Sequence, residues 1–319
     1  MSVRILNEQD VHRLLPMAAC IAAMEEALAA LARGEVFNPL RFVVRPPGEP
    51  NLLGLMPAHR AGREPVFALK AICIAPGNAA AGLDLHQGFV ALFDGATGVP
   101  RAIMNASAVT AIRTAAVSGV ATKLLARPGA RTLAILGAGV QARSHLEAMR
   151  SVLPLERVKV WSRTPGRAAE LDGVEEAASA EEALAGADVV VTATTARAPI
   201  LRRAWLAEGA HVNAVGSSVP TARELDTATV ADAALFVDRR ESTVNEAGDY
   251  LLPLREGAID AGHIRAELGE LLIGAAEGRR SSSALTVFKS LGLAVEDLVA
   301  AEHVLLRAEA EGAGVEVDF

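Results

Sequence analysis

One segment of the chain has the residue spacing of a dinucleotide-binding turn. The strand-like run TLAIL (132–136) leads directly into Gly137, Gly139 and Ala142, which form a G-x-G-x-x-A pattern at the start of a helical segment. In such a turn the first glycine permits a tight bend, the second lets the backbone approach a pyrophosphate, and the alanine lets the helix pack closely on the strand. The N–H groups at the start of the following helix bind phosphate oxygens. Because the pattern stands between a strand and a helix, it predicts a dinucleotide site.

The end of the next strand-like run, RVKVW (157–161), indicates which dinucleotide binds. NAD-dependent enzymes usually carry an acidic residue at this place, where it bonds the ribose 2′-hydroxyl. This chain carries Ser162, Arg163 and Thr164 instead. A guanidinium pairs with a 2′-phosphate, and the two hydroxyls can donate to it. We therefore expect NADPH (NADP+) as the preferred cofactor and NADH as the alternative; if Arg163 is only a solvated surface residue, this preference disappears.

Three basic residues before the turn stand in apolar surroundings. Lys70 lies within the apolar strand VFALKAICI, Arg113 lies on an apolar helical stripe, and Arg41 lies in the strand-like run LRFVV. A buried cation needs an anionic partner. For Arg113 a protein carboxylate and a substrate carboxylate fit the pattern equally well. Lys70 is either an anion ligand or proton donor with a lowered pKa, or an edge-strand lysine that opposes aggregation; the alternative for Arg41 is a solvated face.

The surrounding segments predict an α/β fold with two domains. A helix is expected over 16–33, and short apolar runs separated by turns predict a mostly antiparallel sheet from 40 to 104. A long helix capped by Ser107 follows over 107–126. After it, strand-like and helical segments alternate, which predicts a doubly wound, Rossmann-type parallel sheet. We expect an α+β domain over 1–126, completed by the C-terminal helix (295–319), and a Rossmann domain over 127–294.

Composition limits the partners. The 319 residues are 51% hydrophobic and 22% charged, which favours a folded protein over a disordered one. With a net charge of −7 and no basic block, we expect no nucleic-acid partner. The sequence has no uncharged run of about 18 residues, so we expect no membrane partner. The segment MSVRILNEQD lacks the apolar core of a signal peptide, so we expect a cytoplasmic protein. Cys20 and Cys73 have no metal-ligand spacing, and we expect no metal site.

Several segments, in order along nearly the whole chain, resemble the ornithine cyclodeaminase/mu-crystallin family. They include PLRFVV (39–44), HQGFVALFDGATGVPRAIMN (86–105), TAIRTAAVSGVATKLLA (110–126), LGAGVQARSHLEA (136–148) and TVFKSLGLAVEDLVAA (286–301). The resemblance implies a homodimer whose first domain carries the dimer sheet and the substrate pocket. It also implies a Rossmann domain that binds the nicotinamide cofactor.

The resemblance implies site residues in both domains. Arg41, Lys70 and Arg113 would be the catalytic ligands of the substrate carboxylate, with Gln87 and Thr114 lining the pocket. Together with the residues of the turn and of the strand end, the predicted cofactor site comprises Thr114, Gly137, Gly139, Val140, Gln141, Ala142, Ser162, Arg163, Thr164, Ala193, Thr194, Val215, Gly216, Ser217, Ser218, Ser290 and Gly292.

Two departures separate the chain from true ornithine cyclodeaminases. In those enzymes the loop after the strand that corresponds to HVNAV resembles a G-x-D motif. The resemblance implies that its Asp acts on the substrate amine. Here the loop is Gly216-Ser217-Ser218, and a serine is a poor base at neutral pH without activation. Gly54 also stands where cyclodeaminases carry a glutamate. The chain is thus more similar to NADPH-dependent ketimine reductases, which implies hydride transfer to the C=N carbon of a 2-imino carboxylate, either a cyclic ketimine or an imine of a 2-oxo acid.

Three alternatives stay open. They are an ornithine or lysine cyclodeaminase with recycled NAD+, an amino-acid dehydrogenase of the alanine dehydrogenase type, and a crystallin-like protein that binds a nucleotide or small ligand without catalysis. The substrate side chain, the physiological direction and the proton donor are not fixed by the sequence. If the cations wait for substrate, Arg113→Met and Lys70→Met should melt within a few degrees of the parent. Each should still lose at least about 10²-fold in kcat/KM.

Overall fold

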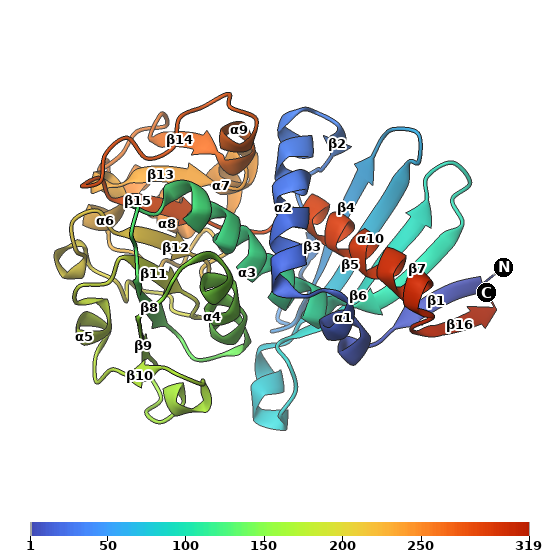
Figure 1. The fold of residues 1–319 in the computed structure, drawn as a ribbon, viewed down its shortest axis with the longest axis horizontal. Helices are drawn as coiled ribbons and strands as arrows, with labels where there is room; N and C mark the ends of the chain where they lie inside the picture. The colour runs from blue at the N-terminus through green and yellow to red at the C-terminus, as the bar shows by residue number, and fades with distance from the viewer. Residues whose placement is uncertain (1, 319) are drawn as a thin grey trace. The chain divides into compact units, whose positions relative to one another are not determined.

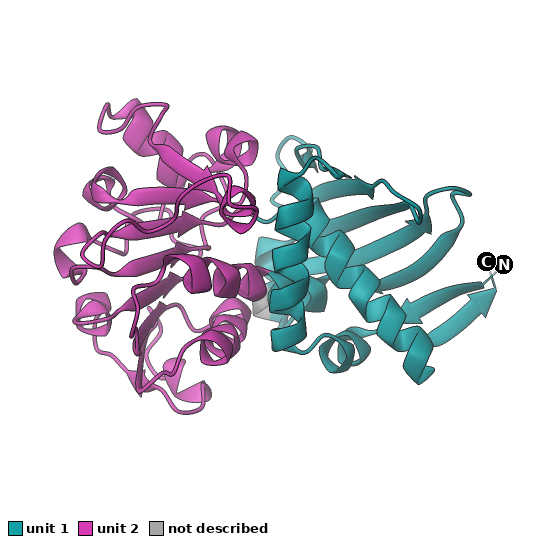
Figure 2. Cartoon of the chain, turned by 45° about the horizontal axis from the view of Figure 1, so that its top comes forward, with its two compact units in different colours: residues 1–113, 292–319 teal, residues 114–291 magenta. Residues whose placement is uncertain are grey.

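The computed structural model describes residues 2–318, and its elements are labelled in Figure 1. The chain forms two compact units (Figure 2): unit 1 comprises residues 1–113 and 292–319, and unit 2 comprises residues 114–291. The chain passes between them inside helix α3 (Ala106–Leu125) and again after Leu291. The expected boundary at 126 coincides with the end of this helix, whereas the units divide within it.

Unit 1 is a mostly antiparallel sheet with helices on one face. Its strands run in the order β16-β1-β7-β6-β5-β4-β2, with β3 paired to β4, and β1 and β7 are parallel. Helix α10 (Ala294–Glu311) packs across the middle strands, and α2 (Met17–Ala32) packs beside it; the short α1 (Glu8–Leu14) precedes α2 (Figure 1). The strands are β1 (Ser2–Leu6), β2 (Val36–Phe37), β3 (Phe42–Val44), β4 (Leu52–Arg60), β5 (Val66–Ile74), β6 (His86–Asp94), β7 (Pro100–Asn105) and β16 (Val315–Asp318), with a 3-10 helix at Pro76–Ala81.

The opposite face of this sheet carries exposed apolar side chains. Phe42, Leu53, Phe67 and Phe89 are 64%, 38%, 47% and 41% exposed. Side chains share a face of a sheet when they lie opposite each other on paired strands or an even number of residues apart on one strand. By this rule the strand pairing places all four on the same face. A contiguous apolar face of this kind is typical of an interaction surface.

Helix α3 has the length and hydropathy of a membrane span, but 83% of its apolar window is buried inside the protein, as in a core helix. It follows Asn105, whose Oδ1 accepts a hydrogen bond from the Ala108 N–H (2.9 Å). The prediction that Ser107 caps it was wrong. The Ser107 hydroxyl donates to the carbonyl oxygen of His86 instead, and so joins α3 to the start of β6.

Unit 2 is a parallel sheet in the order β10-β9-β8-β11-β12-β15-β13-β14, which confirms the predicted Rossmann-type fold. The strand order reverses between β8 and β11: β9 and β10 follow β8 on one side, and β11 and β12 begin the other side, where β15 is inserted before β13 and β14. The strands are β8 (Thr132–Leu136), β9 (Arg157–Trp161), β10 (Glu175–Glu176), β11 (Val189–Thr192), β12 (His211–Ala214), β13 (Ala234–Val237), β14 (Ile264–Glu267) and β15 (Thr286–Lys289). The helices are α4 (Val140–Val152), α5 (Ala180–Leu184), α6 (Thr227–Asp232), α7 (Arg240–Glu246), α8 (Gly248–Arg255) and α9 (Leu268–Leu272), with 3-10 turns at Ala168–Glu170 and Arg203–Trp205.

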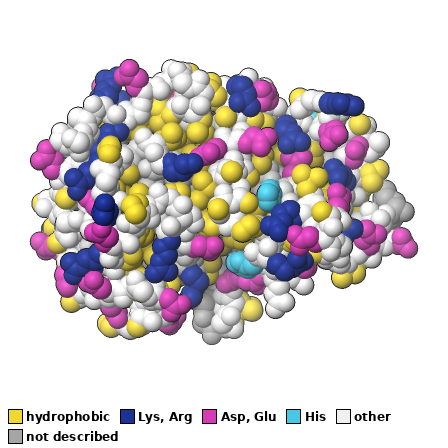
Figure 3. Space-filling model, viewed as in Figure 1, with side chains coloured by type: hydrophobic (Ala, Val, Ile, Leu, Met, Phe, Trp, Pro, Cys, Tyr) yellow, Lys and Arg dark blue, Asp and Glu magenta, His cyan; other side chains and the backbone are white. Residues whose placement is uncertain are grey.

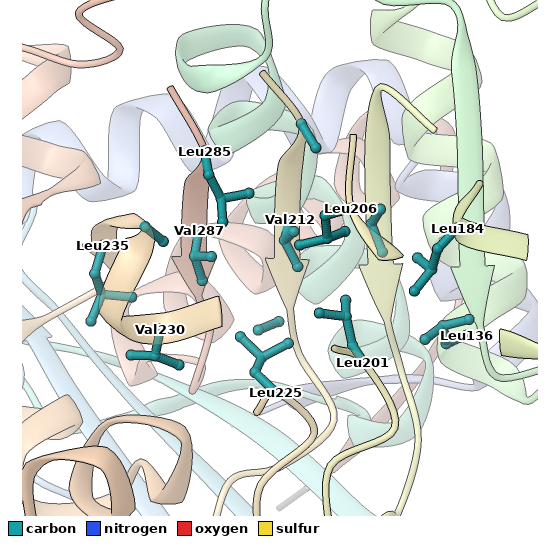
Figure 4. Close-up of a cluster of buried hydrophobic side chains, with 14 of the residues drawn as sticks. Leu136, Leu184, Leu201, Leu206, Val212, Leu225, Val230, Leu235, Leu285 and Val287 are labelled. Carbon is teal, nitrogen blue, oxygen red and sulfur yellow. The ribbon is translucent and has the colours of Figure 1, made fainter. Parts of the chain in front are cut away.

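Apolar side chains from the strands and from flanking segments form the core of unit 2. Figure 4 shows Val212 and Val287 on neighbouring strands, with Leu225 and Val230 from the segment that packs against them. The outer surface is different: on the face shown in Figure 3, basic and acidic side chains lie interspersed. Because its core is closely packed, the sheet is a rigid support for the loops at its strand ends.

Candidate functional site

Lys70 is a buried cation with a carboxylate partner. It lies on the face of β5 that packs against α10, and its Nζ is 2.7 Å from Asp297 Oδ2, with the two side chains 2% and 1% exposed. Thr110 Oγ1 lies 3.4 Å from the same nitrogen. Burial lowers the pKa of Lys70 to about 8; the charge of Asp297 opposes this shift, while those of Arg113 and Arg41 add to it. Since β5 lies between β4 and β6, the edge-strand alternative does not apply.

Arg113 is also paired with acids of α10. Its Nε donates to Asp297 Oδ1 (2.9 Å) and its Nη1 donates to Glu296 Oε2 (2.7 Å), and all three side chains are buried. Of the two partners that the sequence left open, the structure contains the protein carboxylate. The condition that this cation waits for substrate without a protein partner is therefore not met, and we expect Arg113→Met to lower stability, because it removes a buried partner from both acids.

Gly292 lies against both arginines. It has a φ of +79°, and a Cβ at this position would lie 2.5 Å from Arg113 Nη1. Its carbonyl oxygen accepts a hydrogen bond from Arg41 Nη2 (3.1 Å). Arg41 itself is half-buried immediately before β3, not within a strand. The structure thus brings together Arg41, Lys70, Arg113 and Gly292, which lie far apart in the sequence. The three cations of this group suit a carboxylate ligand.

His86 is a further group near these cations. Burial lowers the pKa of His86, and the charges of Lys70 and Arg113 act in the same direction, against Asp84. The structure does not bring Gln87 to the cluster. Its side chain is exposed, and Nε2 donates to the Asp84 carbonyl oxygen (3.2 Å). Thr114 is buried in α3 and is the first residue of unit 2.

Glu296 and Asp297 were not predicted from the sequence. The available signal was a pair of adjacent acids in the first turn of α10, within the otherwise apolar segment GLAVEDLVAA. Their partner Arg113 lies more than 180 residues earlier in the chain, so no local pattern connects them.

In unit 2, the turn between β8 and α4 has the features of a pyrophosphate site. Gly137 has a φ of +122°, and a Cβ there would lie 2.5 Å from the Ala193 carbonyl oxygen, so a side chain does not fit. A Cβ on Gly139 would meet nothing within 4 Å, which leaves room for a ligand. Gly139 caps α4 without a side-chain hydrogen bond, and the first helical residue, Val140, is exposed. The uncapped helix start therefore fits phosphate oxygens.

Below this turn, the first residues of α4 are held in place by buried contacts. Ala142 is fully buried, as the motif requires. The carbonyl oxygen of Gln141 accepts from His145 Nδ1 (2.7 Å), and His145 Nε2 lies 2.9 Å from the Ser118 hydroxyl on α3. Burial lowers the pKa of His145 to about 4, so its ring is neutral and Ser118 donates to it.

The other predicted cofactor residues follow the carboxyl ends of parallel strands, and these ends meet at one edge of the sheet. These cofactor residues are Ser162, Arg163 and Thr164 after β9, Ala193 and Thr194 after β11, Val215, Gly216, Ser217 and Ser218 after β12, and Ser290 after β15. The two adjacent serines differ in burial: Ser217 is buried and its hydroxyl donates to the Ala222 carbonyl oxygen, whereas Ser218 is exposed. Arg163 and Thr164 are exposed.

Comparison with known proteins identifies the family. Residues 1–312 match the ornithine cyclodeaminase/mu-crystallin family. The chain belongs to this family. The resemblance inferred from the sequence is thereby confirmed.

The chain is also similar to individual proteins of known name. It is 42% identical over 308 residues to the ketimine reductase mu-crystallin of Mus musculus, across 94% of this chain and 95% of that protein. The structure of the Thermococcus litoralis Δ1-pyrroline-2-carboxylate reductase in complex with NADH and L-proline has a TM-score of 0.95 and 37% identity, covering 99% of this chain and 100% of that one. An archaeal alanine dehydrogenase dimer with bound NAD has a TM-score of 0.94 and 32% identity, with full coverage of both chains (100%).

Proposed function

We propose that this chain reduces 2-imino carboxylates to amino acids with NADPH. The observation that carries the proposal is the group of Arg41, Lys70 and Arg113, held by Asp297 and Gly292 in a unit attached to a dinucleotide-binding fold. The reaction class predicted from the sequence, NAD(P)H-dependent reduction of a C=N bond, agrees with relatives that are ketimine and pyrroline-2-carboxylate reductases. The loop Gly216-Ser217-Ser218, which lacks an acid, supports a reductase over a cyclodeaminase.

The residues of unit 1 would bind and orient the imine. Charge-assisted hydrogen bonds from Arg113 and Arg41 to the substrate carboxylate fix its position, and Asp297 and Glu296 prevent the Arg113 guanidinium from rotating. Lys70 is protonated below pH about 8 and either binds the carboxylate or transfers a proton to the imine nitrogen. A nicotinamide cofactor, when bound, would supply the hydride for the imine carbon. Hydride and proton together convert C=N to CH–NH.

The preference for NADPH rests on Arg163, which is exposed at the end of β9 where a 2′-phosphate would lie. NADH is the alternative, since the Thermococcus relative binds it. Gly137, Gly139 and the uncapped start of α4 would hold the pyrophosphate of either cofactor.

We also propose a cytoplasmic homodimer. The apolar face formed by Phe42, Leu53, Phe67 and Phe89 supports a self-association surface. The archaeal relative is a dimer. Both cysteines are free thiols, which suits a reducing compartment.

A screen of NADPH oxidation tests the function. We expect turnover with Δ1-pyrroline-2-carboxylate or Δ1-piperideine-2-carboxylate, or with a 2-oxo acid plus ammonia or methylamine. Ammonia release from ornithine or lysine without net NAD+ reduction would identify a cyclodeaminase. Reduction only of pyruvate with ammonia would identify an alanine dehydrogenase. Cofactor binding without turnover of any of these compounds would support the crystallin-like alternative.

A further inference from the structure

A single buried carboxylate joins two of the loops that end the parallel strands. Glu224 is fully buried and accepts four hydrogen bonds. Oε1 accepts from the Thr194 N–H (2.8 Å) and hydroxyl (2.7 Å) after β11. Oε2 accepts from the Thr192 hydroxyl (2.7 Å) and from the Gly216 N–H (2.8 Å) after β12. Each oxygen accepts from one backbone N–H, which can only donate, and from one hydroxyl, so the arrangement favours the ionised carboxylate.

The packing around this carboxylate is close. A Cβ on Gly216 would lie 2.5 Å from Glu224 Oε1 and 2.2 Å from the Thr194 carbonyl oxygen. The same loop after β11 packs against the dinucleotide turn, since a Cβ on Gly137 would lie 2.5 Å from the Ala193 carbonyl oxygen. The charge of Glu224 is therefore fixed in position directly behind loops of the predicted cofactor site.

Two further charges complete the cluster. Asp249 on α8 accepts from the Glu224 and Leu225 N–H groups through Oδ1 (2.9 and 3.0 Å). Its Oδ2 lies 3.0 Å from Lys289 Nζ at the end of β15, and both side chains are buried. Burial raises the pKa of Glu224, and the charge of Lys289 and the hydrogen bonds from Thr194 and Thr192 oppose that shift. Asp249 pairs with the ammonium directly, and the charge of Lys289 also acts on Glu224. The two carboxylates and one ammonium together carry a net negative charge.

The strand order indicates which half of a bound cofactor this charge would face. In a doubly wound sheet a dinucleotide lies across the carboxyl ends of the strands, on both sides of the point where strand order reverses. By this rule Arg163, after β9, would lie on the adenosine side of a bound cofactor. The loops after β11, β12 and β15 would lie on the other side, toward the nicotinamide.

We infer that the Glu224–Asp249–Lys289 cluster is a positioning and electrostatic element that favours the oxidised, positively charged nicotinamide over the reduced, neutral one. This inference rests on the proposed function. A fixed negative charge in a dry environment stabilises a positive charge that develops nearby, without reorganisation. Because positive charge develops on the nicotinamide as hydride departs, the cluster lowers the barrier to transfer as well.

The test compares the dissociation constants of NADP+ and NADPH by titration of protein fluorescence or by calorimetry. Glu224→Gln removes a negative charge and should raise the ratio Kd(NADP+)/Kd(NADPH) by about threefold or more. Asp249→Asn also removes a negative charge and should raise the same ratio. It replaces Glu224→Gln in the test if that variant does not fold. Lys289→Met removes the positive charge and should lower the ratio. The double variant Asp249→Asn/Lys289→Met preserves net charge and should leave it near the parent value.

Asp188 provides a matched control at the opposite end of the same strands. It precedes β11 and accepts from the Arg131 and Thr132 N–H groups (2.8 and 2.9 Å) and from the Thr132 hydroxyl (2.8 Å). Its other oxygen, Oδ1, pairs with Arg127, so Asp188→Asn removes a carboxylate that, like Glu224, is bonded through both oxygens, but at the amino-terminal edge of the sheet. It should lower stability and leave the Kd ratio unchanged.

The opposite signs distinguish an electrostatic role from a structural one. If Glu224→Gln and Lys289→Met shift the ratio in the same direction, leave it unchanged, or are matched by Asp188→Asn, the inference is wrong. If the parent protein binds neither cofactor form, the proposed function itself fails, and that result is separate from any change in ratio.

Discussion

Asp297 joins the two buried cations of unit 1: its Oδ2 lies 2.7 Å from Lys70 Nζ, and its Oδ1 accepts from Arg113 Nε at 2.9 Å. One carboxylate therefore fixes the separation of two groups that we expect to bind the same substrate. It also offsets part of the repulsion between them, which would otherwise disfavour holding both charges in a buried site.

The first prediction concerns pH. The pKa of Lys70 is lowered from 10.5 to about 8 by burial, so Lys70 loses its charge as pH rises through about 8. The affinity for pyrrole-2-carboxylate, an unreactive carboxylate, should fall over this range, because the protonated amine is the form that binds an anion. Calorimetric titrations from pH 6 to about 10 measure the midpoint.

Asp297→Asn should move that midpoint to lower pH, since the charge of Asp297 raises the pKa of Lys70. Glu302→Gln is the matched control: Glu302 lies on the same helix but pairs with Arg60 (2.5 Å). A midpoint that moves equally in both variants, or that lies near 10 in the parent, would contradict this account of Lys70.

The second prediction concerns Arg113. Arg113→Met leaves Glu296 and Asp297 buried with fewer partners, so it should lower the free energy of unfolding by roughly 3–5 kcal/mol. Urea denaturation measures the loss. Adding Glu296→Gln should recover part of it, because the stranded charge is then removed. A single variant that unfolds like the parent would show that the acids adapt without Arg113. Activity toward the imine should also fall at least about 10²-fold.

Much of the fold was predictable because its signals are local. Strands β5, β8 and β9 coincide with apolar runs in the sequence, and the G-x-G-x-x-A turn needs only neighbouring residues. The pairing of β1 with β16 was not predictable: Ser2 lies opposite Asp318, and both strands are short. Strand β15, four residues long, enters the sheet between β12 and β13, which no pattern within TVFK shows.

The candidate site divides in the same way. The residues at strand ends could be placed, because parallel strands bring their carboxyl ends to one edge. The partners of Lys70 and Arg113 could not, because α10 brings Asp297 to them from the far end of the chain. Burial of a cation predicts that an anion exists, but only tertiary structure shows which residue supplies it.

The third prediction separates the two loop serines. Ser218 is exposed and Ser217 donates its hydroxyl to the Ala222 carbonyl oxygen. Ser218→Ala should leave imine reduction within about tenfold of the parent, whereas Ser217→Ala should lower stability by about 0.5–1.5 kcal/mol through the lost hydrogen bond. Steady-state kinetics and thermal melts measure these effects. A loss above about 10³-fold in Ser218→Ala would assign its hydroxyl a direct role in the transition state.

The fourth prediction concerns self-association. Phe67→Glu and Phe89→Glu place charges on the exposed apolar face of the sheet, and together they should convert a dimer into a monomer, as judged by light scattering. Leu306→Glu is the control, because Leu306 is also exposed but lies on α10, on the other side of the sheet. A parent protein that is monomeric at micromolar concentration would refute the proposed dimer.

The last prediction tests the choice of cofactor at Arg163. This residue follows the end of β9, where its guanidinium would pair with the 2′-phosphate that only NADPH carries. A hydrogen bond to a charged group contributes about 1.5–3 kcal/mol, so Arg163→Ala should weaken NADPH binding by about 10- to 100-fold. The Kd for NADH should change less than about threefold, because NADH presents no phosphate there. Arg157→Ala is the matched control. Arg157 is the first residue of the same strand and forms an ion pair with Glu175 (2.7 Å), so neither Kd should change. Fluorescence titrations with both cofactors give the four constants, and an equal loss of affinity for NADH and NADPH in Arg163→Ala would show that Arg163 does not read the phosphate.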